Sequence, residues 1–203
     1  METMTQLSYQ CAYAQAAYPG NSPEQAGDRF LVQATRRGVL VAVIDGLGHG
    51  EKAATAALAA VDAFQQDVNR PVKVQLEHCS RAIRVTRGAA VSIAQFDAAN
   101  AQLEWAGVGN VYAGVVRSQD TLKRESLLSR GGVVGFRLPT IRPSKVSIYP
   151  YDTLVMATDG IRSGFLQDAP LRQSPQVIAD YIHTNFKRGT DDSLVVVLRF
   201  VPA

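Results

Sequence analysis

The sequence predicts an α+β fold in which two mostly antiparallel β-sheets pack together, with helices on their outer faces. Strand-like runs come first, a pair of helices follows, further strands come next, and one helix precedes the last strand. This order does not produce the alternating βαβ units of a parallel doubly wound sheet. The chain has 203 residues, 46% of them hydrophobic, which is enough to bury a core, and we expect residues 1–203 to form one domain.

Apolar alternation and β-branched runs between turn residues predict the strands. The predicted strands cover residues 7–17, 30–34, 39–44, 89–96, 102–108, 111–117, 133–136, 145–149, 153–157 and 193–201. A loop is expected over 19–23, and Arg36-Arg37-Gly38 is typical of a hairpin turn. The last run is apolar along most of its length, which favours a central strand.

Three helices are predicted from apolar residues that recur every three or four positions. The first begins near Lys52, Pro71 opens the second, and the third covers 174–186 with Ser174 as N-cap and Pro175 at its first position. The neighbours of these apolar positions are mostly alanine, which permits close packing on a sheet. The apolar positions are Ala54, Leu58, Val61, Phe64 and Val68 in the first helix, and Val74, Leu76, Cys79 and Ile83 in the second.

Charge and composition argue against several classes of function. The net charge is only +3 and the basic residues are scattered, so no nucleic-acid partner is expected. The N-terminus lacks the basic and apolar regions of a signal peptide, and no apolar run reaches the roughly 20 residues of a membrane helix, so no membrane partner is expected either. Two cysteines, Cys11 and Cys79, form neither a disulfide framework nor a metal site by themselves. We therefore expect a cytoplasmic protein.

Acidic residues gather where strands are predicted to begin or end: Asp28, Asp45, Asp159, Asp191 and Asp192. A carboxylate at the rim of a cleft must be hydrated, paired or bound to a metal. Gly46, which follows Asp45, allows a sharp turn that can bring its carbonyl oxygen to the same ion. Oxygen donors of this kind suit Mg²⁺ or Mn²⁺ rather than zinc.

A simpler interpretation of these residues stays open, because Asp-Gly is also the commonest hairpin turn signal. Taken alone, each Asp-Gly pair is more typical of a turn than of a metal site. Both pairs follow apolar strands, however, and the second is followed by Ile161-Arg162-Ser163 rather than by a return strand. The residues by themselves are therefore compatible with an acidic metal site and equally with two ordinary turns.

Six motifs occur in an order that resembles the bacterial, SpoIIE-like branch of the metal-dependent serine/threonine protein phosphatases (the type 2C, or PPM, family). They are Gly27-Asp28-Arg29-Phe30, Val43-Ile44-Asp45-Gly46-Leu47-Gly48-His49-Gly50, Arg87-Gly88-Ala89-Ala90-Val91-Ser92-Ile93, Gly107-Val108-Gly109-Asn110, Thr158-Asp159-Gly160 and Thr190-Asp191-Asp192. The resemblance runs from about residue 8 to residue 200. Within the family, the chain is most similar to the stand-alone stressosome phosphatases. The resemblance implies an α-β-β-α sandwich with a two-metal centre at one end.

The resemblance also implies roles for the acidic residues. Asp45 would bridge two divalent cations, Mn²⁺ or Mg²⁺, and would be the central catalytic ligand. Asp159 and Asp191 would complete the shell of one ion, while Asp28 and the carbonyl of Gly46 would serve the other. Asp192 would hold the ligands in place without binding a metal ion itself. Two such cations, about 3.5–4 Å apart, produce hydroxide at neutral pH and neutralise charge on a phosphoryl group.

The implied substrate is phosphoserine or phosphothreonine on the STAS-domain scaffold proteins of a stressosome. Two alternatives stay open: the same enzyme acting on an anti-anti-sigma factor outside a stressosome, and a pseudophosphatase module that binds phosphoproteins without hydrolysing them. The sequence shows no sensor or membrane segment ahead of the motifs, which favours the stand-alone type. The arginine that holds the substrate phosphate in the animal and plant branches has no clear counterpart, and Arg29 is a candidate.

Overall fold

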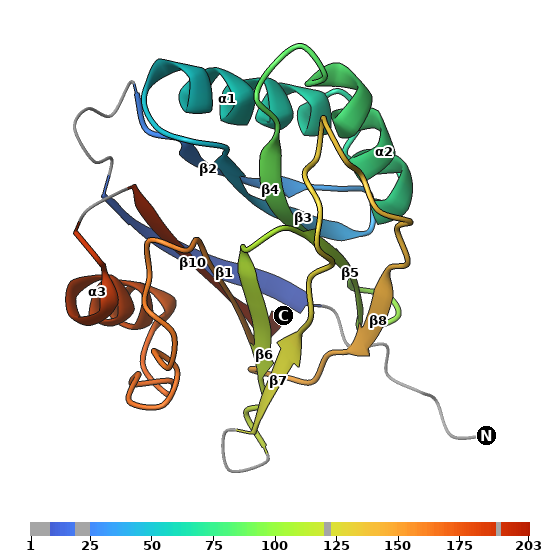
Figure 1. The fold of residues 1–203 in the computed structure, drawn as a ribbon. Helices are drawn as coiled ribbons and strands as arrows, with labels where there is room; N and C mark the ends of the chain where they lie inside the picture. Colours follow the sequence, from blue (N-terminus) through green and yellow to red (C-terminus); the bar gives the residue numbers. More distant parts are fainter. Residues whose placement is uncertain (1–8, 19–24, 120–122, 190–191) are drawn as a thin grey trace.

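The computed structural model describes residues 9–18, 25–119, 123–189 and 192–203, which form two sheets and three helices (Figure 1). The strands are β1 (Tyr9–Tyr18), β2 (Asp28–Ala34), β3 (Gly38–Gly46), β4 (Ala89–Asp97), β5 (Gln102–Val108), β6 (Tyr112–Val116), β7 (Arg124–Leu127), β8 (Ser144–Ser147), β9 (Thr153–Ala157) and β10 (Ser193–Pro202). The helices are α1 (Glu51–Gln65), α2 (Val72–Ala82) and α3 (Pro175–Phe186).

The strands form two five-stranded sheets in which every pairing is antiparallel. Sheet A has the order β1-β10-β9-β6-β7, and sheet B has the order β2-β3-β4-β5-β8. The helices α1 and α2 cover the outer face of sheet B, and α3 covers the outer face of sheet A (Figure 1). The predicted α-β-β-α sandwich is therefore confirmed.

Three apolar clusters hold these four layers together. The first lies between the sheets and includes Phe96, Trp105 and Phe200, the second packs α1 and α2 onto sheet B, and the third packs α3 onto sheet A. Fully burying an aliphatic or aromatic side chain contributes roughly 1.5–3 kcal/mol, so these clusters supply most of the driving force for folding. None of the helices in the described residues is both long and apolar enough to cross a membrane.

The predicted face of α1 is partly wrong. Its buried side is made of alanines and Phe64, while Leu58 is 47% exposed, and the helix ends at Gln65, before Val68. The alanines let α1 approach β3 closely, as the Ala53 carbonyl does at Gly46, and Leu58 lies outside the buried side that they form with Phe64. On α2, Val74 is likewise 39% exposed rather than buried. The N-cap of α3 is confirmed, because Ser174 Oγ accepts from the backbone N–H of Val177 at 3.4 Å.

The strand predicted over 133–136 is wrong, and an unpredicted strand, β7, occurs earlier. Residues 133 and 134 form only isolated bridges, Val134 with Ala89 and Val133 with Arg137. The first three residues of β7 are exposed, because β7 is the edge of sheet A and needs little apolar character. The other predicted strands are confirmed to within a few residues, and the loop expected over 19–23 lies outside the described residues.

Candidate metal centre

Two of the predicted ligands face each other across one strand pair. In the antiparallel register of β2 and β3, Asp28 lies directly opposite Asp45. Side chains opposite each other project to the same side of a sheet, and side chains two residues apart on a strand share a face. Val43 belongs to the core between the sheets, so Asp45 and Asp28 project from sheet B toward sheet A.

Sheet A brings further oxygen atoms to the same place. The Thr158 hydroxyl, just after β9, donates to Asp28 Oδ2 at 2.6 Å. Asp192, just before β10, accepts a hydrogen bond through Oδ2 from the backbone N–H of Gly27, which precedes Asp28. Asp159 follows Thr158, and its Oδ2 accepts from Asn110 Nδ2 at 2.7 Å. The ends of both sheets therefore meet at a cluster of carboxylates.

The electrostatics of Asp28 follow from this closeness of the carboxylates. Burial is the largest cause that raises the pKa of Asp28, and the neighbouring charges of Asp45, Asp192 and Asp159 raise it further, to about 8. The hydrogen bond from Thr158 acts in the opposite direction but does not outweigh them. Like charges held in a desolvated site repel one another, and a bound cation relieves that repulsion.

The Gly46 position depends on the absence of a side chain. A Cβ on Gly46 would lie 2.1 Å from the carbonyl oxygen of Ala53, in the first turn of α1. A Cβ on Gly27 would lie 3.3 Å from both the Gly46 carbonyl oxygen and Asp192 Oδ2, so these two oxygens converge on the same spot. The close packing of α1 thus brings a backbone carbonyl to the edge of the carboxylate cluster.

The donors present are carboxylate and carbonyl oxygens, which are the ligands that Mg²⁺ and Mn²⁺ prefer. In the part of the chain that the structure describes, no three or more His, Cys, Asp or Glu side chains stand as a complete set of metal ligands. The predicted ligand Asp191 lies outside the described residues. Of the other predicted site residues, Asp28, Asp45, Gly46, Asp159 and Asp192 all lie at the same end of the two sheets.

Sequence reasoning assigned no role to three residues that the structure places at the centre. Thr158 and Asn110 bind carboxylates directly, and Arg87 Nη1 would lie 2.5 Å from a Cβ on Gly48, a glycine with a φ of 90°. All three occur in the quoted motifs, which was the available signal. Their contacts join residues far apart in the chain, and spacing alone does not reveal such contacts.

Arg29, the candidate for holding a phosphate, lies at the rim of this centre. Its Nη1 donates to the backbone carbonyl of Asp28 at 2.9 Å. Arg29 and Asp28 also line a cavity of about 340 Å³, together with Tyr18 and Ser193. The guanidinium group of Arg29 is therefore bound to the main chain of β2 at Asp28.

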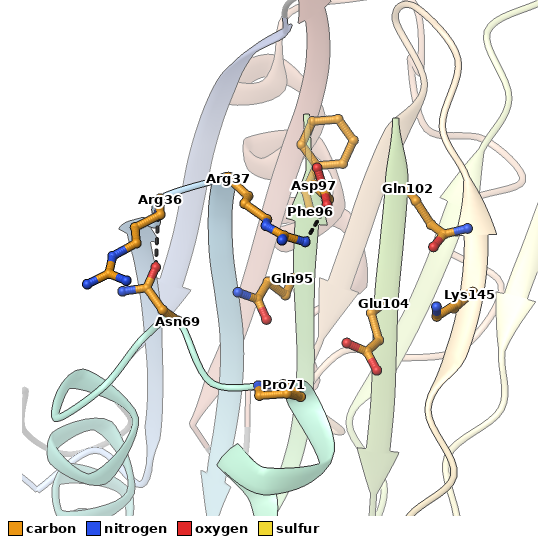
Figure 2. Close-up of a pocket in the computed structure, with 10 residues that line it drawn as sticks. All are labelled: Arg36, Arg37, Asn69, Pro71, Gln95, Phe96, Asp97, Gln102, Glu104 and Lys145. Carbon is orange, nitrogen blue, oxygen red and sulfur yellow. Dashed lines mark hydrogen bonds and ion pairs between the residues drawn. The ribbon is translucent and has the colours of Figure 1, made fainter. Parts of the chain in front are cut away.

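A second cavity, of about 440 Å³, lies at the opposite end of sheet B (Figure 2). It is lined by the β2–β3 turn, by the segment between α1 and α2, and by β4, β5 and β8. Its charges are of both signs, and Arg37 pairs with Asp97 at 3.4 Å across it. The carboxylate cluster has no counterpart among the residues that line this cavity.

Comparison with known proteins agrees with this geometry. The family model of stage II sporulation protein E (SpoIIE) matches residues 35–201. The phosphoserine phosphatase RsbX of Bacillus subtilis (strain 168) is 33% identical over 85 residues, which cover 42% of this chain and 43% of that relative. The match thus spans less than half of the curated relative's length.

Two solved structures share the fold over almost the whole chain. A chain from work on the bacterial stressosome as a modular system adapted to control secondary messenger signalling is 25% identical, with a TM-score of 0.84 over 94% of this chain and 100% of that chain. RsbX in complex with magnesium is 22% identical, with a TM-score of 0.80 over 98% of each chain. The chain therefore belongs to the SpoIIE family and has the PPM-type phosphatase fold, with RsbX among its relatives.

Proposed function

We propose that this chain is a metal-dependent phosphoprotein phosphatase that hydrolyses phosphoserine or phosphothreonine, and that residues 1–203 act as one phosphatase domain. The observation that carries the proposal is the meeting of Asp28 and Asp45 from sheet B with Asp159 and Asp192 from sheet A. Membership of the SpoIIE family supports the same conclusion.

The residues fit a centre of two divalent cations, Mg²⁺ or Mn²⁺. Asp45 would bridge the two, Asp28 and the Gly46 carbonyl would hold one, and Asp159 and Asp191 would hold the other. When bound, such a pair supplies a hydroxide at neutral pH and neutralises charge on the phosphoryl oxygens. Asp192 would position the main chain ahead of Asp28 through its hydrogen bond to Gly27.

Two hydrogen bonds orient the carboxylates for this task. Thr158 donates to Asp28, and Asn110 donates to Asp159, so each carboxylate keeps one defined orientation. Groups of this kind around a metal centre fix the direction of its ligands and tune their basicity. Arg29 and Arg87, at the rim, carry positive charge where a substrate phosphate would approach.

For the substrate we propose phosphorylated STAS-domain proteins of a stressosome. The support is the similarity to RsbX and to a chain from work on the stressosome. A phosphorylated anti-anti-sigma factor presents the same phosphate chemistry, so both substrates belong in the same assay. A module that binds phosphoproteins without cleaving them would bind either one and release no phosphate.

The test measures phosphate release from a phosphorylated STAS protein and from a phosphorylated anti-anti-sigma factor, with Mn²⁺, with Mg²⁺ and with EDTA. We expect metal-dependent release by the natural chain and a loss of at least about 10²-fold in Asp45→Asn. Asp168→Asn, an exposed aspartate of the segment between β9 and α3, is the matched control and should retain the natural rate.

Binding without release in the presence of either metal would establish the non-catalytic module instead. Equal release by Asp45→Asn and the natural chain would overturn the role of the carboxylate cluster. Faster release from the anti-anti-sigma factor would overturn the stressosome assignment alone, because the chemistry would be unchanged.

A further inference from the structure

Two loops beside the carboxylate cluster together form a basic and apolar surface. They are residues 83–88, between α2 and β4, and residues 130–137, between β7 and β8, and we call their exposed face the arginine surface. Its exposed side chains are Arg84, Val85, Arg87, Arg130, Phe136 and Arg137.

The two loops are held against each other by the main chain. Ala89 and Val134 exchange hydrogen bonds of 3.0 and 2.9 Å, and the backbone N–H of Gly135 donates to Ser80 Oγ at 3.0 Å. A Cβ on Gly135 would lie 2.7 Å from Ile83 Cγ1. The backbones of the two loops therefore lie side by side and are hydrogen-bonded to each other.

The two loops carry no acidic residue of their own. The sequence contains no Asp or Glu between Glu77 and Asp97, nor between Glu125 and Asp152. Within the described residues, none of the four arginines of this surface forms an ion pair. The cavity at the far end of sheet B differs in this respect, because both acidic and basic side chains line it. The arginine surface thus needs an acidic partner to balance it.

Its apolar residues indicate what kind of partner. Val85 is 96% exposed and Phe136 is 87% exposed, the highest exposure of the large hydrophobic side chains in the described residues. Aromatic residues and arginine are enriched at the centres of protein–protein interfaces. Phe136 and the arginines can contact either a protein or a nucleic-acid base, whereas Val85 can pack on a protein side chain but cannot stack on a base, so the mixture favours a protein partner.

Both loops reach the carboxylate cluster. The guanidinium of Arg87 lies over Gly48, in the loop that follows Asp45. On the other side, the main chain of Arg130 is bonded to two residues at the end of β5. The Arg130 N–H donates to the Gly107 carbonyl, and the Arg130 carbonyl accepts from the Gly109 N–H, both at 2.9 Å. Gly109 precedes Asn110, which binds Asp159. A protein bound to the arginine surface would therefore place some of its residues next to the carboxylate cluster.

We infer that the arginine surface is the docking site for the phosphoprotein substrate, whose phosphorylated residue is flanked by acidic side chains and at least one apolar side chain. The inference rests on the proposed phosphatase function. Docking supplies attraction that a free phosphate ester does not receive, so the part of the surface beyond Arg87, which lies at the carboxylate cluster itself, acts on the affinity for the substrate protein and not on the chemical step.

The test compares a phosphoserine peptide with Asp, Glu and Leu flanks, the same peptide with Lys flanks, and p-nitrophenyl phosphate, which reports the metal centre alone. We expect the natural chain to prefer the acidic peptide. Arg84→Glu/Arg137→Glu should lower kcat/KM for that peptide by about tenfold, mainly through KM. Phe136→Ala should act in the same direction, while hydrolysis of p-nitrophenyl phosphate stays within about twofold of the natural rate.

Two matched controls lie away from this surface. Arg36→Glu changes an exposed arginine in the turn at the far end of sheet B, and Val177→Ala changes an exposed apolar residue on α3. Both should leave the kinetics on the acidic peptide unchanged. A comparable loss in Arg36→Glu would show a general effect of charge and would overturn the docking site.

The outcomes separate this inference from the proposed function. If the natural chain hydrolyses neither the peptides nor p-nitrophenyl phosphate with metal present, the phosphatase proposal fails and the docking site fails with it. If the natural chain is active and Arg84→Glu/Arg137→Glu matches it on the acidic peptide, the docking inference alone fails. Competition by single-stranded RNA or by anionic vesicles, lost in the same variant, would assign the surface to those ligands and would also overturn it.

Discussion

The hydroxyl of Thr158 donates to Asp28 and accepts from Leu194, so that one side chain joins the two sheets at the carboxylate cluster. The bond to Asp28 Oδ2 is 2.6 Å long, and the bond from the Leu194 N–H is 2.9 Å long. Thr158 is almost completely buried. The position of Asp28 relative to β9 and β10 therefore depends on a hydroxyl group, which carries no charge.

Replacing Thr158 by valine keeps the shape of the side chain and removes both hydrogen bonds. The Leu194 N–H then loses its acceptor in a buried place, and we expect the free energy of unfolding to fall by about 1–3 kcal/mol. Thr158→Ser retains the hydroxyl and should lose less stability. Urea unfolding of the two variants checks the prediction, and equal stability of both would show that the hydrogen bonds contribute little.

The stability of the metal-free protein should fall as the pH rises from about 4 to about 8. Burial and the neighbouring carboxylates raise the pKa of Asp28 to about 8, whereas an unfolded aspartate has a pKa of about 3.9. Between these values the native state keeps a proton that the unfolded state has released, so rising pH favours unfolding. A divalent cation favours the ionised carboxylate and should reverse the trend.

Thermal unfolding in EDTA and in Mg²⁺, each measured near pH 5 and near pH 8, checks this dependence. The stabilisation by Mg²⁺ should be larger near pH 8, and Asp28→Asn should weaken both the pH trend in EDTA and the effect of Mg²⁺. A metal-free protein that gained stability over the same range would contradict the raised pKa of Asp28.

Gly46→Ala should be clearly destabilising, because the added Cβ would lie 2.1 Å from the Ala53 carbonyl oxygen. Overpacking of this kind costs about 1–3 kcal/mol, and the displaced α1 would also shift the Gly46 carbonyl. Gly131→Ala is the matched control, since an added Cβ there meets nothing within 4 Å. Chemical unfolding and the metal concentration needed for half-maximal activity check the two effects together.

Asp152→Ala should destabilise the fold strongly without changing the chemistry. Asp152 is 1% exposed and accepts from Arg117 Nη1 at 2.7 Å and from the backbone N–H of Ser118 and Tyr149 at 2.9 and 3.1 Å. Breaking a buried ion pair costs about 3–5 kcal/mol, because a charge is left without its partner.

The partially exposed Glu125, which also pairs with Arg117, supplies the control for that measurement. Glu125→Gln should cost less than about 1 kcal/mol, as is usual for pairs in contact with solvent. Asp152 precedes β9, whereas Thr158 follows it, so the activity of the folded fraction toward p-nitrophenyl phosphate should be unchanged in both variants. A loss of activity at full folding would show that the two ends of β9 are coupled.

The sequence predicted what depends on local periodicity. The hairpin of β2 and β3 follows from two apolar runs and a turn, and this hairpin alone places Asp28 opposite Asp45. Ser174 and Pro175 marked the start of α3 in the same way. These features need no knowledge of distant parts of the chain.

Features that depend on other layers were missed or wrong. The buried face of α1 is decided by its distance from sheet B, and a helical pattern cannot distinguish a face of alanines from a stripe containing Leu58. The edge strand β7 has polar, exposed residues and leaves no apolar signal. The bonds of Thr158 and Asn110 to carboxylates join residues that are 130 and 49 positions apart. Only the folded chain brings such partners together.

The pairing of β1 with β10 has a consequence for folding during synthesis on the ribosome. Among the described strands β1 pairs with β10 alone, over the register from Tyr9 opposite Pro202 to Tyr18 opposite Ser193. Synthesis proceeds from the N-terminus, so β1 stays unpaired until β10, the last strand, has been made. Asp192 emerges just before β10. A nascent chain interrupted before Asp192 carries Asp28, Asp45 and Asp159 but lacks Asp192 and the Leu194 N–H that donates to Thr158, so truncated products carry an incomplete cluster.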